Sequence, residues 1–221
     1  MATMGLTDQR VHEDLVDAYL ALEGIEETSS DGRHARREAN RNRVIAALLD
    51  LTAEGHAWPN VSQIAMRAEV SERSIFRYFD DMDDLAQTAF DTRLRDAFPY
   101  SVISRPWPAD PGERLELLVE TRANLFEFIT PVASVSRSQV NQSPVLARSL
   151  KKVRELLRTQ IAILFEEELE SLEGDRDQVL FALDVVFAFE SWFLIRSDQE
   201  RTVEEAKDVL ALTGRRLLEL A

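Results

Sequence analysis

Cysteine is absent from the 221 residues, and glycine and proline occur only seven times each. Without cysteine the chain has no disulfide framework, no thiolate metal site and no cysteine nucleophile, which favours a reducing compartment, most simply the cytoplasm. The unbroken apolar runs, such as Val185 to Phe189, are too short to cross a bilayer, and the N-terminus lacks a basic start followed by an apolar stretch. We therefore expect a soluble, unprocessed protein that does not enter a membrane.

The sequence also lacks the residue patterns of common catalytic sites. It has no phosphate-binding glycine loop and no Gly-x-Ser-x-Gly nucleophile elbow. His12, His34 and His56 are scattered, and none follows a glutamate by three positions as in di-iron bundles. The densest carboxylate run, residues 166–170, has no histidine partner and is interpreted as a solvated helix face. We expect no enzyme activity, no metal site and no cofactor.

Acidic residues dominate the chain, but not evenly. The formal charge of −14 divides into −6 for residues 1–30, zero for residues 31–82 and −8 for residues 83–221. Residues 33–43 hold five arginines against one glutamate, a local charge of +4. A basic run this short is typical of a solvated arm before a helix, yet it makes residues 31–82 the part best suited to a polyanion. Residues 1–30 are interpreted as a frayed tail, with docking onto the basic arm as a further hypothesis.

Apolar residues recur at helical spacing along nearly the whole chain, and no convincing alternating strand pattern is present, so we predict an all-α fold. Pro99 to Pro108 holds three prolines and is expected to interrupt the helices. The predicted division is an acidic extension (1–30), a small three-helix domain (31–82) and a larger helical domain (83–221). Predicted helices cover residues 7–24, 35–54, two short stretches within 60–79, 83–98, 111–129, 144–172, 177–197 and 202–220.

The last two predicted helices carry more apolar surface than one small unit can cover. Between Leu180 and Ile195 eleven of sixteen residues are large and apolar, and a helix apolar on nearly every side must be covered on every side. The following helix has an apolar seam that steps by three and four residues from Val203. We predict a four-helix interface between two copies; the alternative is packing inside one chain. The residues expected at the interface are Phe181, Phe189, Trp192, Phe193, Val203, Leu210 and Leu217.

Residues 60–79 are predicted to form two short helices joined by a tight turn. Asn60 and Gln63 have the spacing of a capping box, and Ser71 is placed to cap the second helix. The expected inner faces are Ile64, Ala65 and Ala68 on the first helix and Ile75, Phe76 and Phe79 on the second, with Val70 in the turn. Glu72, Arg73, Ser74, Arg77 and Tyr78 are left facing outward. This pattern predicts a helix-turn-helix, whose second helix can lie in the DNA major groove.

Several short motifs occur together around this segment. They are the helix from Arg36 to Glu54 with Gly55 after it, Val61-Ser62-Gln63-Ile64-Ala65, Val70-Ser71, Ile75-Phe76-Arg77-Tyr78-Phe79, and Asp84-Leu85. Together they resemble the DNA-binding domain of the tetracycline-repressor (TetR) family of bacterial transcription regulators. Phe189-Glu190-Ser191-Trp192 through Glu204-Glu205-Ala206 is similar to the family's C-terminal pattern. The resemblance implies a dimeric DNA-binding regulator, commonly a repressor, that a small molecule releases from its operator.

The side chains of this region suit contacts with double-stranded DNA. Arginine pairs with guanine or phosphate, and hydroxyl groups bind phosphate. We expect replacement of Arg36 and Arg37 by alanine to weaken binding to all DNA about equally, and Arg73→Ala or Arg77→Ala to change the sequence preference. The full set of expected DNA contacts is Arg36, Arg37, Arg43, Ser62, Gln63, Ser71, Glu72, Arg73, Ser74, Arg77 and Tyr78.

Three positions depart from the family pattern. Glu69 stands where glycine is usual in the turn, and a left-handed conformation costs any other residue roughly 1 kcal/mol. Phe76 replaces a frequent tyrosine and Met82 a frequent lysine. Each phosphate that the protein no longer neutralises should make the log–log salt dependence shallower by about 0.9. These departures, with the acidic residues 1–30, favour the alternative of a dimeric helical interaction protein whose helix-turn-helix no longer binds DNA.

The resemblance further implies that the larger domain binds a small effector, which would act through the helix from about residue 83 to residue 98. Aromatic and polar residues of that domain are the candidates for its pocket, with plain core packing as the alternative for each aromatic. They are Trp107, Arg122, Asn124, Phe126, Phe165, Asp184 and Phe187. Their mixture indicates a hydrophobic or amphipathic ligand.

Overall fold

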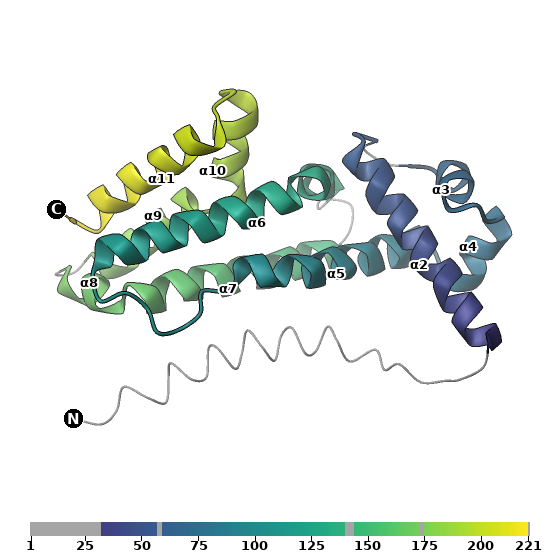
Figure 1. Cartoon of the computed structure of the whole chain (residues 1–221), viewed down its shortest axis with the longest axis horizontal. Helices are drawn as coiled ribbons and strands as arrows, with labels where there is room; N and C mark the ends of the chain where they lie inside the picture. The colour runs from purple at the N-terminus through teal and green to yellow at the C-terminus, as the bar shows by residue number, and fades with distance from the viewer. Residues whose placement is uncertain (1–31, 57–58, 140–143, 173–174, 221) are drawn as a thin grey trace. The chain divides into compact units, whose positions relative to one another are not determined.

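The computed structural model describes residues 32–56, 59–139, 144–172 and 175–220, so the predicted helix 7–24 and the acidic extension lie outside the described residues. Within these ranges the chain is helical and contains no strand, which confirms the predicted all-α fold (Figure 1). The helices are α2 (Gly32–Ala53), α3 (Val61–Ala68), α4 (Glu72–Tyr78), α5 (Met82–Ser101), α6 (Pro111–Gln139), α7 (Pro144–Leu164), α8 (Glu166–Ser171), α9 (Arg176–Val186), α10 (Phe189–Phe193) and α11 (Val203–Leu217). They form two compact units.

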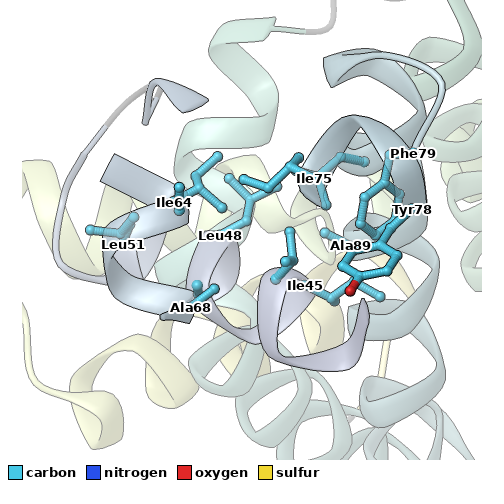
Figure 2. Close-up of a cluster of buried hydrophobic side chains, with 13 residues drawn as sticks. Ile45, Leu48, Leu51, Ile64, Ala68, Ile75, Tyr78, Phe79 and Ala89 are labelled. Carbon is cyan, nitrogen blue, oxygen red and sulfur yellow. The ribbon is translucent and has the colours of Figure 1, made fainter. Parts of the chain in front are cut away.

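The first unit, within residues 32–96 and 129–150, is built around the apolar face of α2. Val44, Leu48 and Leu51 recur at steps of four and three and are buried, as the helical period requires. Helices α3 and α4 pack against α2 and against each other, and their apolar side chains close this core (Figure 2). Gly55 ends the α2 segment with φ of +91°, a left-handed conformation that glycine adopts without a Cβ clash.

The second unit, within residues 97–128 and 151–220, packs α11 closely on its own core. The Thr202 and Glu205 side chains form a capping box at the start of α11. Ala206, Leu210 and Gly214 are the buried residues of this helix. A Cβ atom on Gly214 would lie 2.7 Å from Cδ1 of Leu115, so glycine permits the close approach.

Two predicted helix ends are wrong because a proline does not stop the helix. Helix α5 continues through Pro99 to Ser101, and α6 continues through Pro131 to Gln139 instead of ending at residue 129. A proline inside a helix removes one backbone hydrogen bond, which the rest of the helix can outweigh. The predicted helix 144–172 is also divided, since α7 and α8 are separated at Phe165.

The predicted helix 177–197 is in fact three segments: α9, α10 and a π-helical turn at Leu194–Asp198. The break lies at Phe187 and Ala188, where Ala188 is extended, with φ −80° and ψ 154°. The carbonyl oxygen of Val185 accepts a hydrogen bond of 2.5 Å from the Ser191 hydroxyl. A side chain thus binds a backbone group beside the break, which has no proline or glycine to mark it.

Among the described residues, no single helix is long and apolar enough to cross a membrane. Helix α9 and residues 189–198 reach that length and composition only when taken together, and they are bent by 43° at their junction.

Candidate nucleic-acid interface

Local hydrogen bonds fix the start of α3 and the turn between α3 and α4. Asn60 Oδ1 accepts from the backbone N–H of Gln63, and Gln63 Oε1 accepts from the backbone N–H of Asn60, both at 2.9 Å, which confirms the capping box. Glu69 has φ 55° and ψ 42°, the left-handed conformation usually taken by glycine. Ser71 Oγ accepts from the backbone N–H of Ser74 at 3.2 Å and caps α4. The turn therefore forms without glycine, at the cost of strain at Glu69.

The inner face of α4 differs from expectation at two positions. Ile64, Ala65 and Ala68 of α3 are buried as predicted. On α4, however, Tyr78 is 9% exposed and Phe76 is 53% exposed, so the predictions that Phe76 packs inside and Tyr78 faces outward are wrong. With 3.6 residues per turn, the residues three and four after buried Ile75 share its face, whereas the next residue is turned about 100° away. Figure 2 shows Tyr78 and Phe79 in the buried cluster.

The outward face of α4 consists of Glu72, Arg73, Phe76 and Arg77, all exposed, with Ser74 half-buried. Residues four apart are neighbours on a helix surface, so Glu72 lies beside Phe76, and Arg73 lies beside Arg77. The exposed Ser62 hydroxyl of α3 donates to Glu72 Oε1, so two expected DNA contacts are bonded to each other. Within the part of the chain that the structure describes, no ion pair joins Arg73 or Arg77 to a carboxylate. This face therefore presents two uncompensated guanidinium groups.

A chain of hydrogen bonds connects α2 with the end of α4. Arg43 Nη2 donates to Asn40 Oδ1 at 2.7 Å, and Asn40 Nδ2 donates to the Tyr78 hydroxyl at 3.3 Å. Arg77 Nη2 donates to the same hydroxyl at 3.1 Å. Asn40 is not among the contacts expected from sequence, although it lies four positions before the buried Val44 and so on the same side of α2.

The basic run on α2 divides into differently placed arginines. Arg36, Arg37 and Arg43 are exposed. Arg43 Nη1 of α2 lies 3.8 Å from Oε2 of Glu69, the residue after α3, so the charge of Arg43 is partly compensated. Arg41 is half-buried. The side chain of Arg33 lies outside the described residues. The run therefore offers Arg36 and Arg37 as its most available cations.

In the second unit, the structure brings two of the expected pocket residues, Arg122 and Asp184, within electrostatic range of each other. Arg122 is fully buried; its Nη1 donates to Gln160 Oε1 at 2.7 Å and its Nη2 to the carbonyl of Leu157 at 3.0 Å. Burial lowers the pKa of Arg122 to about 9, against the opposing charge of Asp184. Burial likewise raises the pKa of Asp184, whose Oδ2 lies 3.8 Å from Arg158 Nη1. A buried cation thus lies within electrostatic range of a half-buried anion in this unit.

The other expected pocket residues do not form one group. Phe126, Phe165 and Phe187 are buried in the core, as the packing alternative for these aromatics predicts. Trp107 is half-buried, and its indole N–H donates to a backbone carbonyl four residues earlier. Asn124 is exposed on α6, so its part in a pocket with the buried aromatics stays a prediction. Its neighbours Ala123 and Leu125 are both buried, so Asn124 occupies the exposed side of α6 at this turn.

The residues expected at a dimer interface differ in their burial. Trp192 and Leu210 are buried within the unit, so their prediction as interface residues is wrong. Trp192 Nε1 donates to Glu127 Oε1 at 2.9 Å, and Leu210 lies on the inward face of α11. Phe181 is exposed, whereas Phe189, Phe193, Val203 and Leu217 are half-buried. The exposed apolar residues that the prediction missed are Val185, Leu194, Val209 and Leu212.

Comparison with known proteins decides the fold. No protein-family model and no curated protein matches the chain. A solved transcriptional regulator from Rhodococcus sp. Rha1 matches with a TM-score of 0.66 and 20% identity, over 81% of this chain and 96% of that one. A TetR transcription regulator from Haloarcula marismortui ATCC 43049 matches with a TM-score of 0.57 and 17% identity, over the same shares of each chain. This chain has the TetR-regulator fold.

The TetR-regulator fold agrees with the predicted order of a helix-turn-helix followed by a larger helical region. Both neighbours are described as transcription regulators. Across the residues that can be placed, no group of three histidine, aspartate or glutamate side chains could hold a metal ion.

Proposed function

We propose that this protein is a DNA-binding transcription regulator. The observation that carries the proposal is the outward face of α4, where Arg73 and Arg77 stand exposed on a helix-turn-helix with its own buried core. The second helix of such a pair can place its outward side chains at base edges and phosphates of the major groove. The TetR-regulator fold supports the same function.

The charge distribution supports selective DNA binding in spite of the acidic total. Residues 31–82 are neutral overall, and Arg36 and Arg37 add exposed cations beside the helix-turn-helix. Residues 83–221 carry a charge of −8. Their acidity should keep non-specific association with DNA weak, so that affinity depends on a small, oriented face.

We further propose that the regulator acts as a homodimer through α9 and α11, which pack against each other. Phe181 and Val185 lie four residues apart on α9, and Val209 and Leu212 lie three apart on α11, so each helix exposes an apolar pair on one side. Burying a large apolar side chain contributes about 1.5–3 kcal/mol. Two copies joined at these helices would present two recognition helices to a pair of half-sites.

The effector we propose is a small hydrophobic or amphipathic molecule that releases a repressor from its operator. The buried Arg122 and the half-buried Asp184, which lie near the buried aromatics of this unit, are the polar groups that support it. A ligand changes DNA affinity only if it binds the DNA-competent and incompetent states differently. Accordingly, the true effector should raise the unfolding temperature and weaken DNA binding, whereas a molecule that does only the first is not the effector.

A mobility-shift assay with the DNA upstream of the protein's own gene, at two salt concentrations, tests the proposed function. A regulator retains that DNA in preference to a random duplex and loses affinity as salt rises, because phosphate contacts release counterions. Equal retention of both duplexes, or none at low salt, would instead support a dimeric interaction protein with a helix-turn-helix that does not bind DNA specifically.

A further inference from the structure

The two arginines on the outward face of α4 have different surroundings. The guanidinium carbon of Arg77 lies 5.3 Å from the ring centroid of Tyr78, and its Nη2 donates to the Tyr78 hydroxyl at 3.1 Å. Arg73 is exposed, and no hydrogen bond or ion pair holds its side chain within the described ranges. The Arg77 side chain is therefore held by Tyr78, whereas the Arg73 side chain is available to contact a base edge.

The group that ties Arg77 is itself anchored from α2. The Tyr78 hydroxyl accepts from both Asn40 and Arg77, and Asn40 accepts from Arg43. Because the hydroxyl accepts twice, its own proton remains available for donation to an acceptor. The donors from Asn40 and Arg77, with the positive charges of Arg77 and Arg37, lower the pKa of Tyr78, although burial opposes this. The junction of α2 and α4 is thus rich in donors and positive potential.

We propose that Arg77 and Tyr78 form one binding site for a DNA backbone phosphate, with Asn40 as the positioning residue, and that Arg73 is the arginine that recognises a base. This inference rests on the proposed DNA-binding function and replaces the sequence-based expectation that Arg77 sets the sequence preference. A phosphate oxygen only accepts hydrogen bonds and so matches this set of donors. Recognition of guanine uses a bidentate guanidinium fork, and Tyr78 already engages part of the Arg77 fork.

The test measures binding of four variants, Arg73→Ala, Arg77→Ala, Arg77→Lys and Tyr78→Phe, and of the double variant Arg77→Ala with Tyr78→Phe. Two probes are used: a duplex selected by the wild-type protein from a library with a random central segment, and an unselected duplex. Tyr78→Phe keeps the buried ring and removes only the hydroxyl. Circular dichroism checks that each variant is folded, which is expected because Arg73 and Arg77 are exposed.

Arg77→Ala should weaken binding to both duplexes by the same factor. It should also reduce the slope of log affinity against log salt concentration by about 0.9, the contribution of one phosphate. Arg77→Lys should restore most of that slope, since lysine also binds phosphate as a point charge. Tyr78→Phe should weaken binding to both duplexes equally. In the Arg77→Ala background it should cause little further loss of affinity. Arg73→Ala should reduce the preference for the selected duplex by roughly 5- to 150-fold, the range of one bidentate base contact.

The inference is overturned if Arg77→Ala reduces the preference for the selected duplex as much as Arg73→Ala does. It is also overturned if the effects of Tyr78→Phe and Arg77→Ala are fully additive, because the two side chains would then not act as one site. Failure of the wild-type protein to bind either duplex at low salt would refute the proposed DNA-binding function itself, and is thereby distinguished from failure of the assignment within it.

Discussion

The helix-turn-helix and helices α9 and α11 expose different kinds of side chain. Around α2, α3 and α4 most apolar residues close a core within the unit, although Met66 and Phe76 are exposed. The exposed side chains there include arginines without ion-pair partners in the described chain, such as Arg73 and Arg77. On α11 the cations Lys207 and Arg215 each pair with a carboxylate of α6, and the exposed residues of α9 and α11 include large apolar side chains such as Val185 and Leu212.

This difference indicates what each region binds. Uncompensated guanidinium groups gain most from a polyanion, whose condensed counterions they displace. Exposed apolar side chains gain most from another apolar surface. A single chain can therefore contain one face suited to DNA and one suited to a second copy of itself, and changes to one face should leave the other unaffected.

The largest effect is expected at the apolar face. Val185→Glu combined with Leu212→Glu should weaken self-association at least about 100-fold, because two apolar burials of about 1.5–3 kcal/mol each are removed. Sedimentation equilibrium at micromolar concentration should then show a monomer for this variant and a dimer for the wild type.

Asn124→Glu, at an exposed polar position of α6 in the same unit, is the control for added charge and should remain dimeric. A wild-type protein that sediments only as a monomer, or a double variant that still dimerises, would contradict the assignment of this face.

The next effect concerns the arginines of α2. Replacing Arg36 and Arg37 by alanine should weaken binding to selected and unselected duplexes equally and reduce the log–log salt slope by about 0.9 for each phosphate that is no longer neutralised. Fluorescence anisotropy titrations at several salt concentrations measure both quantities. The charge-matched control replaces Lys151 and Lys152, exposed on α7, and should leave the slope unchanged. An equal reduction of the slope in both variants would show a general charge effect.

A smaller effect is expected at the strained turn. Glu69→Gly should raise the free energy of unfolding by up to about 1 kcal/mol, because glycine adopts the left-handed conformation without a Cβ clash. Urea unfolding followed by circular dichroism measures this change. Glu69→Gln keeps the strain and removes the charge, so it should give no gain. If both substitutions stabilise equally, charge and not backbone strain is the cause.

The smallest effect is a pH dependence within the second unit. Hydrogen bonds from Arg196 and Trp192 lower the pKa of Glu127 in the folded chain, although burial opposes them. The stability that this carboxylate contributes is therefore present above the ordinary glutamate pKa and is lost as the pH falls through the lower, folded value. Thermal unfolding between about pH 6 and about pH 3, which spans the titration of glutamate, should show this loss in the wild type but not in Glu127→Gln. The effect is small because the side chain is 41% exposed.

Local hydrogen bonding made the helix-turn-helix predictable from sequence. The capping residues Asn60, Gln63 and Ser71 act within three positions along the chain, so their spacing alone is informative. Apolar character alone assigns Phe76 to the inward face of α4, whereas angular position assigns Tyr78 to it, and angular position is the correct guide here. An amphipathic tyrosine can bury its ring and keep a hydrogen bond at its hydroxyl, which is what Tyr78 does.

Tertiary packing explains what could not be predicted in the last helices. Because residues 180–195 are apolar on nearly every side, periodicity does not distinguish the inward from the outward face. Trp192 and Leu210 are inside and Val185 is outside for reasons that depend on neighbouring helices. The break at Ala188 likewise depends on packing and on the Ser191 hydroxyl, not on a proline or glycine.

Sedimentation of the protein with a fluorescent duplex from upstream of its own gene tests the central claim most directly, because it reports DNA binding and self-association together. The account predicts a complex in which the duplex carries chains in multiples of two, which dissociates as salt is raised, and which Arg73→Ala weakens without producing free monomer. A duplex that sediments unbound at low salt, or that carries a single chain, would contradict it.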